Sequence, residues 1–246
     1  MGFIIWPKMV VRNFSFSVFF PMTRGKSSNS STCVARGERK FKSLPLNKIG
    51  PHNGDVISTL VGNLLGDSWG EKRGESSRFH IHMSTKNMEY ASFLHKFFSD
   101  RQYCSTMWPK KKKETGKGGK IYYSVRFRTY SYRSLSWLQE LFYPGGLAKR
   151  VPRNISSLLT PHALAIWFMD DGAASGAGCR IATHPFPLED VQLLKDTLSQ
   201  LYGFNCTIQR QGERWTIYFI KGEKPLLSGL IKPFMIPSMY YKLNVK

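Results

Sequence analysis

Two aspartates end two apolar segments of the chain. Segments 60–67 and 164–171 align without gaps, and each ends in an acid. These acids, Asp67 and Asp171, are separated by 171 − 67 = 104 residues. Because a helix places partial negative charge at its C-terminus, an aspartate there is unfavourable unless a cation is near. Two such carboxylates, brought together with helix-end carbonyls, would form an oxygen-rich site suited to Mg²⁺, able to assist phosphodiester hydrolysis.

Either aspartate alone has a simpler explanation. Any apolar helix must end, and an acid followed by Ser68 or Gly172 is an ordinary place for it to end. That explanation is weaker for the pair, because both acids stand in register and each helix opens a repeat. We therefore interpret Asp67 and Asp171 as candidate metal ligands.

Hydrophobic periodicity predicts a similar order of elements around each aspartate. The first set is predicted to contain a helix at 55–66, a strand at 78–84, a helix at 88–100, a hairpin with arms 106–112 and 120–130, and a helix at 134–142. The second is predicted to contain a helix at 161–171 capped by Thr160, a turn at 172–178, a strand at 179–184, a helix at 188–202, a hairpin with arms 205–211 and 214–220, and a helix at 224–234. We predict an α+β fold of two repeats, 55–155 and 156–246.

Residues 1–54 differ from the rest of the chain. They contain nine Lys or Arg residues but a single acid, Glu38, and a cluster of serines. We interpret this segment as a poorly ordered basic arm or leader. A transit peptide, an arm that lies along phosphates and the translated upstream part of a larger reading frame remain alternatives.

Composition restricts the class of partner. The chain has 36 Lys+Arg and 16 Asp+Glu in 246 residues, a formal charge of +20, which points to a polyanion. Its 41% of hydrophobic residues can form a folded core. Since no long uninterrupted apolar run occurs, we predict no membrane span. The four cysteines are far apart and lack a C-x-x-C pair, which argues against a zinc ribbon or a disulfide framework.

The predicted strands alternate between apolar and polar residues, so each sheet should have one open polar face. Arg can bind guanine and Gln can bind adenine in the major groove, which makes this face a candidate DNA-binding surface. Its candidate residues are Arg78, His80, His82, Ser124, Arg126, Arg128, Arg180, His184, Thr207, Gln209, Gln211, Arg214, Thr216 and Tyr218. Lys110 and Lys112 are candidate phosphate contacts. The opposite side of the 120–130 arm, from Ile121 to Phe127, should pack on the helices.

Several segments resemble the LAGLIDADG homing endonucleases, in the subgroup that carries both motifs on one chain. The resemblance rests on the aspartate-ended helices and on these motifs: Lys149-x-Val-Pro152, Leu159-Thr-Pro161, Trp167-Phe-Met-Asp-Asp-Gly172, Leu230-Ile-Lys-Pro233, Ile236-Pro237 and Tyr241-Lys-Leu243. It covers roughly residues 55–246. It implies two αββαββα repeats related by a pseudo-twofold axis, with their first helices packed together and their antiparallel sheets forming a saddle over DNA.

The resemblance also implies roles for individual residues. By position, Asp67 and Asp171 bind the metal, and the backbone carbonyls of Gly66 and Asp170 complete its coordination. The side chain of Asp170 is a further candidate ligand. The chain departs from the family pattern where Ile166 replaces a close-packing glycine, Asp170 a small residue and Ser68 a closing glycine. Gly62 and Gly66 would give the first helix the small face that offsets Ile166.

Lys149 and Lys242 match the basic residues near each active centre, where they would order the attacking water or stabilise developing charge. The resemblance implies a monomeric, intron-encoded organellar enzyme, mitochondrial or chloroplast. It would use Mg²⁺, with Mn²⁺ able to substitute, to cut both strands of a specific DNA site and leave 3′ overhangs. Two alternatives stay open: an RNA maturase for the host group I intron, with or without cleavage, and a DNA-binding repressor without catalysis.

Overall fold

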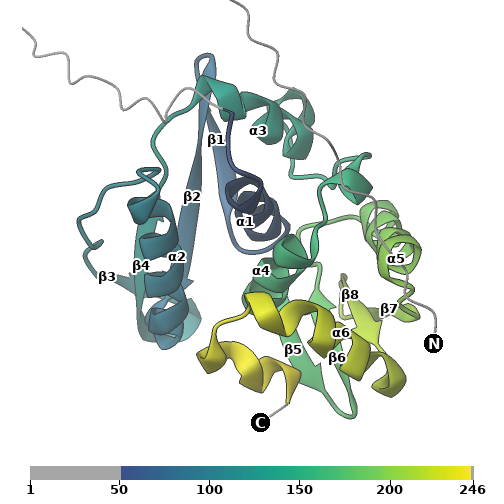
Figure 1. The fold of residues 1–246 in the computed structure, drawn as a ribbon. Helices are drawn as coiled ribbons and strands as arrows, with labels where there is room; N and C mark the ends of the chain where they lie inside the picture. The colour runs from purple at the N-terminus through teal and green to yellow at the C-terminus, as the bar shows by residue number, and fades with distance from the viewer. Residues whose placement is uncertain (1–50, 245–246) are drawn as a thin grey trace, which may run out of the picture. The chain divides into compact units, whose positions relative to one another are not determined.

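The computed structural model describes residues 51–244, and within them one order of elements occurs twice (Figure 1). The first set contains α1 (Gly54–Leu65), β1 (Trp69–Arg73), β2 (Ser76–Ser84), α2 (Met88–Asp100), β3 (Lys112–Thr115), β4 (Ile121–Arg128) and α3 (Ser136–Phe142). The second contains α4 (Pro161–Asp171), β5 (Gly172–Ser175), β6 (Gly178–Ala182), α5 (Leu188–Tyr202), β7 (Cys206–Gln211), β8 (Arg214–Phe219) and α6 (Lys224–Ile231). The predicted αββαββα repeat is confirmed. Residues 1–50 of the predicted basic arm lie outside the described range.

Each set forms a four-stranded antiparallel sheet with equivalent topology. The strand orders are β1-β2-β4-β3 and β5-β6-β8-β7. Alternation sets the register: Phe79, Ile81 and Met83 of β2 are buried, and Ile81 lies opposite Phe127 of β4. The polar residues of these strands therefore share the opposite face of the sheet.

The helices α1 and α4 pack side by side (Figure 1). Glycine makes this approach possible, because a Cβ added to Gly62 would lie 2.6 Å from the Cβ of Ile166. A Cβ added to Gly66 would lie 2.6 Å from the Cβ of Asp170. Each glycine thus faces the residue 104 positions ahead, which is its partner in the repeat alignment. The predicted small face of α1 is confirmed, and it accommodates Ile166.

Local signals set several helix boundaries. Thr160 caps α4, since its Oγ1 accepts a hydrogen bond from the backbone N–H of Ala163 at 3.1 Å. Gly203 ends α5 in the left-handed conformation, with φ of 71°. Helices α2 and α5 begin and end at the predicted residues.

The errors of the sequence prediction fall on edge strands. No strand was predicted at β1, and β5 stands where we predicted a turn at 172–178. The first arm of the first hairpin, predicted at 106–112, is β3 at Lys112–Thr115. An edge strand pairs on one side only and needs little apolar alternation, so it leaves a weak sequence pattern. We predicted that Ile121 and Tyr123 pack on the helices, and this prediction is wrong. Both residues are exposed, because the helices do not cover the outer end of β4.

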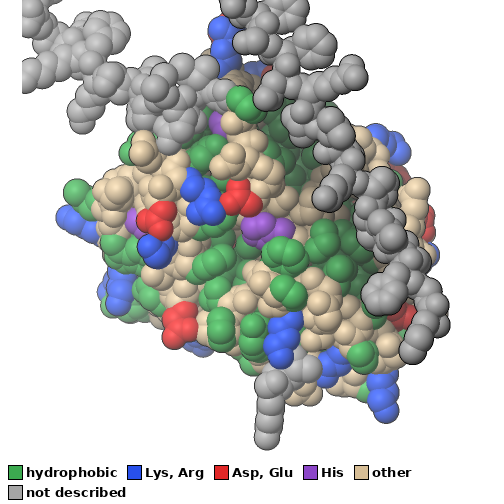
Figure 2. Space-filling view, in the orientation of Figure 1, with side chains coloured by type: hydrophobic (Ala, Val, Ile, Leu, Met, Phe, Trp, Pro, Cys, Tyr) green, Lys and Arg blue, Asp and Glu red, His purple; other side chains and the backbone are tan. Residues whose placement is uncertain are grey.

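Basic side chains are not gathered into one area on the face shown in Figure 2. There, basic and acidic side chains are interspersed with hydrophobic ones (Figure 2). The excess of basic residues therefore forms no continuous patch on that face. Within residues 51–244, no helix has both the length and the apolar character needed to cross a membrane.

Candidate active site and nucleic-acid interface

The two predicted metal ligands stand at the C-terminal ends of the paired helices. Asp171 is the last residue of α4, and Asp67 follows Gly66, which ends α1. Burial raises the pKa of Asp171 to about 7, and the negative charge of Asp67 adds to the shift. Burial also raises the pKa of Asp67, opposed by Lys242 and Lys149. The two carboxylates are therefore close enough to repel each other, as a shared cation site requires.

Each helix end is held by a lysine from the end of its own repeat. Lys149 Nζ donates to the carbonyl oxygens of Gly66 and Ser68, both at 2.8 Å. Lys242 Nζ donates to the carbonyl oxygens of Met169 at 2.5 Å and Asp170 at 2.8 Å. A cation at a helix C-terminus offsets the macrodipole. The lysines thus supply part of the positive charge that the paired acids require.

Both lysines have lowered pKa values. Burial lowers the pKa of Lys149 to about 8, although Asp171, Asp170 and Asp67 oppose the shift. Burial lowers the pKa of Lys242 in the same way. An ammonium group has three N–H donors, and each lysine uses two of them on carbonyls. One donor is left on each Nζ for a water molecule or a phosphate oxygen.

The side chain of Asp170 turns into the helix interface rather than the metal site. Both of its carboxylate oxygens are buried, and they face Gly66. Burial raises the pKa of this carboxyl well above its ordinary value, with Asp67 and Asp171 adding to the shift. Burial thus favours the protonated form of Asp170. Its backbone carbonyl accepts a hydrogen bond from Lys242.

The predicted donor set fits a hard divalent cation. It consists of the carboxylates of Asp67 and Asp171 and the carbonyls of Gly66 and Asp170, all of them oxygen. No group of three His, Cys, Asp or Glu side chains suited to a metal ion occurs in the part of the chain that the structure describes. An ion at this site would therefore depend on the carbonyls and on oxygens from water or phosphate.

In the first sheet, predicted DNA-binding residues are held by acids that the sequence prediction missed. Glu71 of β1 accepts hydrogen bonds from Arg78 and contacts His80 at 2.6 Å. Glu114 of β3 accepts a hydrogen bond from Ser124 at 2.9 Å and lies 3.3 Å from His82. Glu71 and Glu114 lie on the two edge strands of this sheet, which the sequence pattern did not predict at these residues. Had these strands been predicted, the alternation of side chains along each strand would have placed both acids on the polar face. His80 and His82 therefore each contact an acid of an edge strand.

Four further candidates of the first half are all exposed. Arg126 and Arg128 are exposed on β4, and Lys112 lies opposite Ser124 at the edge. The guanidinium of Arg126 lies 5.3 Å from the centre of the Trp69 ring. Lys110 precedes β3 and is exposed. The structure therefore brings Arg126, Arg128 and Lys112 onto one sheet, with Lys110 beside its edge.

In the second sheet the candidates form cross-strand rows. The register places Arg180 beside Tyr218 and Thr207, and Thr216 beside Gln209. Gln211 lies opposite Arg214, whose guanidinium is 3.4 Å from His184 Nδ1. Of the set, Thr216 is buried, and the residues of β7 are exposed. No acid belongs to these rows of described residues.

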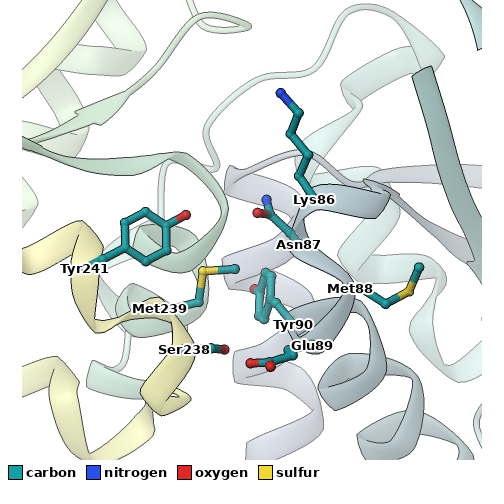
Figure 3. Close-up of a pocket in the computed structure, with 8 residues that line it drawn as sticks. All are labelled: Lys86, Asn87, Met88, Glu89, Tyr90, Ser238, Met239 and Tyr241. Atoms are coloured by element: carbon teal, nitrogen blue, oxygen red, sulfur yellow. The ribbon is translucent and has the colours of Figure 1, made fainter. Parts of the chain in front are cut away.

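A separate pocket of about 570 Å³ lies between the start of α2 and the C-terminal 3₁₀ segment Pro237–Leu243. Figure 3 shows Tyr241 and Met239 on one side and Lys86 and Tyr90 on the other. None of its lining residues belongs to the predicted active site. The paired acids therefore lie at the end of the helix pair and not in this pocket.

Comparisons with known proteins agree with the fold and with the family resemblance. Over 208 residues the chain is 35% identical to the cytochrome b mRNA maturase bI2 of Saccharomyces cerevisiae, covering 80% of this chain and 49% of that protein. Over 158 residues it is 38% identical to the intron-encoded endonuclease ai4 of Dictyostelium discoideum, covering 62% of this chain and 99% of that protein. The chain thus spans about half the length of the yeast maturase.

A solved structure shares the fold. The homing endonuclease I-WcaI, bound to its DNA recognition sequence, superposes with a TM-score of 0.73 at 22% identity, covering 82% of this chain and 96% of that one. Residues 57–227 match the LAGLIDADG DNA endonuclease family. Since this match spans most of both repeats, the chain belongs to the LAGLIDADG DNA endonuclease family.

Proposed function

We propose that this protein is a site-specific endonuclease that cuts both strands of a DNA duplex, with one active centre for each strand. The observation that carries the proposal is the duplicated arrangement of an acid and a lysine. Asp67 with Lys149, and Asp171 with Lys242, stand at equivalent helix ends. We assign residues 55–155 to the first repeat and 156–246 to the second.

In the proposed mechanism the protein positions the scissile phosphates and controls protons around them. The residues Asp67 and Asp171 would hold Mg²⁺ or Mn²⁺, which would supply Lewis-acid activation of the phosphodiester. The free N–H of Lys149 and of Lys242 would donate to a phosphate oxygen or to the attacking water. Because burial lowers both lysine pKa values, either Nζ can also exchange a proton with that water.

The remaining parts of the proposal are what the family resemblance implies. We propose that the sheets hold a long, asymmetric duplex, that the active protein is a monomer, and that it cuts to leave 3′ overhangs. Its gene would lie in an organellar intron, and its target would be the joined flanking exons. The exposed polar residues of β4, β7 and β8 support DNA as the partner.

A cleavage assay tests this proposal. A plasmid that carries the uninterrupted host-gene sequence should be linearised by the protein in Mg²⁺. The double variant Asp67→Asn, Asp171→Asn should lose at least about 10²–10³-fold of the rate, because both carboxylates are removed. Asp196→Asn is a matched control, since this aspartate is exposed on α5. Undiminished cleavage by the double variant would contradict the mechanism.

A second candidate is an RNA maturase that assists splicing of its host intron. The 35% identity to the yeast maturase favours it. A splicing assay with the host-intron RNA, run beside the cleavage assay, separates the two activities. Splicing that survives the double Asn substitution while cleavage is lost would assign RNA binding to a surface apart from the acids.

A further inference from the structure

Glu71 is an acid on a sheet face that is otherwise rich in basic residues. Its Oε2 accepts from Arg78 Nε at 2.7 Å and lies 2.6 Å from His80 Nε2. Its Oε1 accepts from Arg78 Nη2 at 3.0 Å and from Arg73 Nη1 at 3.3 Å. A carboxylate offers about four lone-pair positions, so these contacts fill them. Glu71 therefore has no acceptor left for a base.

The groups around Glu71 are held in one arrangement. Glu71 and Arg78 are direct cross-strand partners on β1 and β2, as are Trp69 and His80. The His80 ring stacks on Trp69 with 4.8 Å between ring centres and 5° between planes. The side chain of Arg78 is only 15% exposed. Arg78 therefore loses little further rotational freedom when it binds a ligand.

The contacts of Arg78 leave one edge of its guanidinium available. Glu71 occupies the edge formed by Nε and Nη2. The other edge, formed by Nη1 and the second N–H of Nη2, has no partner among the described residues. This edge presents two parallel donors, the arrangement that matches O6 and N7 of guanine in the major groove.

A carboxylate beside DNA repels phosphate, so Glu71 lowers general affinity for the duplex. It also prevents Arg78 from swinging toward a phosphate, because the guanidinium is already paired. We propose that Glu71 is a positioning residue that makes Arg78 a guanine reader. This inference rests on the proposed DNA-binding function. It separates Arg78 from residues such as Lys112, which are free to contact phosphates without base preference.

A selection from a pool of randomised DNA duplexes, bound in EDTA to prevent cleavage, tests the inference. The parent protein should enrich a sequence with guanine at one position read by Arg78. Glu71→Gln keeps the side-chain shape but removes the charge, and it should reduce discrimination at that position by between about 5-fold and about 150-fold. Preferences at positions away from Arg78 and His80 should not change, because His80 also contacts Glu71. Binding to unselected DNA should be equal or stronger.

Two controls separate positioning from a general structural effect. Glu140→Gln removes an equally charged group, since this exposed acid of α3 pairs with Lys72, and it should leave every base preference unchanged. In an Arg78→Ala background, Glu71→Gln should have no further effect on the guanine position. Thermal unfolding of each variant checks that it is folded.

The outcomes are distinguishable. If the parent protein enriches no sequence, the proposed function fails, and the inference fails with it. If the parent enriches a site but Glu71→Gln keeps the same guanine preference, the proposed function stands and the role of Glu71 is wrong. A uniform loss of preference at all positions by folded Glu71→Gln would likewise overturn the positioning role.

Discussion

The two halves of the protein are alike at the helix ends and different on the sheets. At the helix ends, each half has one aspartate. Each half also has one lysine, whose Nζ donates hydrogen bonds to backbone carbonyls. On the sheets, the first half holds its Arg and His residues with Glu71 and Glu114, whereas the rows of the second half contain no acid among the described residues. The proposed cleavage of two strands would need the same groups twice, whereas an asymmetric duplex would need two different reading surfaces.

The helix ends also differ in one respect. The residue Asp67 is more accessible to solvent than Asp171, although burial raises the pKa of both carboxyls. In the first half the residue before the acid is Gly66, and in the second it is Asp170, which fills the space that the glycine leaves. The repeat is therefore symmetric in its backbone contacts but not in its packing, and this difference can be tested.

The largest expected effect comes from disabling one of the two proposed active centres at a time. Lys149→Met and Lys242→Met each remove one ammonium from one helix end, and each should slow cleavage of one strand by about 10²-fold. Strand-specific labelling of a cognate duplex would measure the two rates. Equal slowing of both strands by either variant would show that the centres do not act separately.

The next effect concerns the unequal faces of the helix pair. Gly62→Ala places a Cβ against Ile166 and should lower the free energy of unfolding by about 1–3 kcal/mol. Gly229→Ala, within α6 and with open space around it, is the matched control and should raise stability by about 0.5–1 kcal/mol. Urea unfolding measures both. A neutral Gly62→Ala would mean that the helices separate easily.

The half-buried acid should make stability depend on pH. The folded state holds the proton of Asp171 up to about pH 7, whereas the unfolded chain releases it near pH 4. The contribution of Asp171 to the free energy of unfolding should therefore fall as pH rises from about 4 to about 7, and this contribution should change little above pH 7.

The substitution Asp171→Asn removes the ionisable carboxyl, and with it the fall in the free energy of unfolding between about pH 4 and about pH 7. In EDTA at pH 8 the variant should be more stable than the parent by about 1–2 kcal/mol, a value reduced for partial solvent exposure, and equally stable near pH 4. The variant Asp67→Asn should raise the free energy of unfolding by less, because Asp67 is more accessible to solvent than Asp171. Urea unfolding at both pH values measures the difference. A variant no more stable than the parent at pH 8 would show that the lysines already neutralise Asp171.

The smallest effect concerns the edge of the first sheet. Lys112→Gln removes one exposed charge, so the slope of log affinity against log salt should become shallower by about 0.9. Gln209→Ala on the second sheet removes no charge and should leave the slope unchanged while altering base preference. Titrations with the selected duplex at several salt concentrations measure both slopes. The same slope in all three proteins would place Lys112 away from the phosphates.

The sequence by itself determined the helices, the repeat and the two acids. Apolar periodicity, the Thr160 cap and the Gly203 stop are local signals, so α2, α4 and α5 were predicted at their observed positions. The alignment of Asp67 with Asp171 needs no coordinates, because it is a relation between two segments of one string.

Only the tertiary structure decided which polar groups meet. The edge strands β1 and β3 owe their form to pairing with β2 and β4, so their own residues carry a weak pattern. The contact between Glu71 and Arg78 could therefore not be predicted from the sequence, because it depends on the pairing of β1 with β2. The direction of Asp170 likewise depended on the glycine of the other helix. Such contacts join residues far apart in the chain, and packing rather than local propensity selects them.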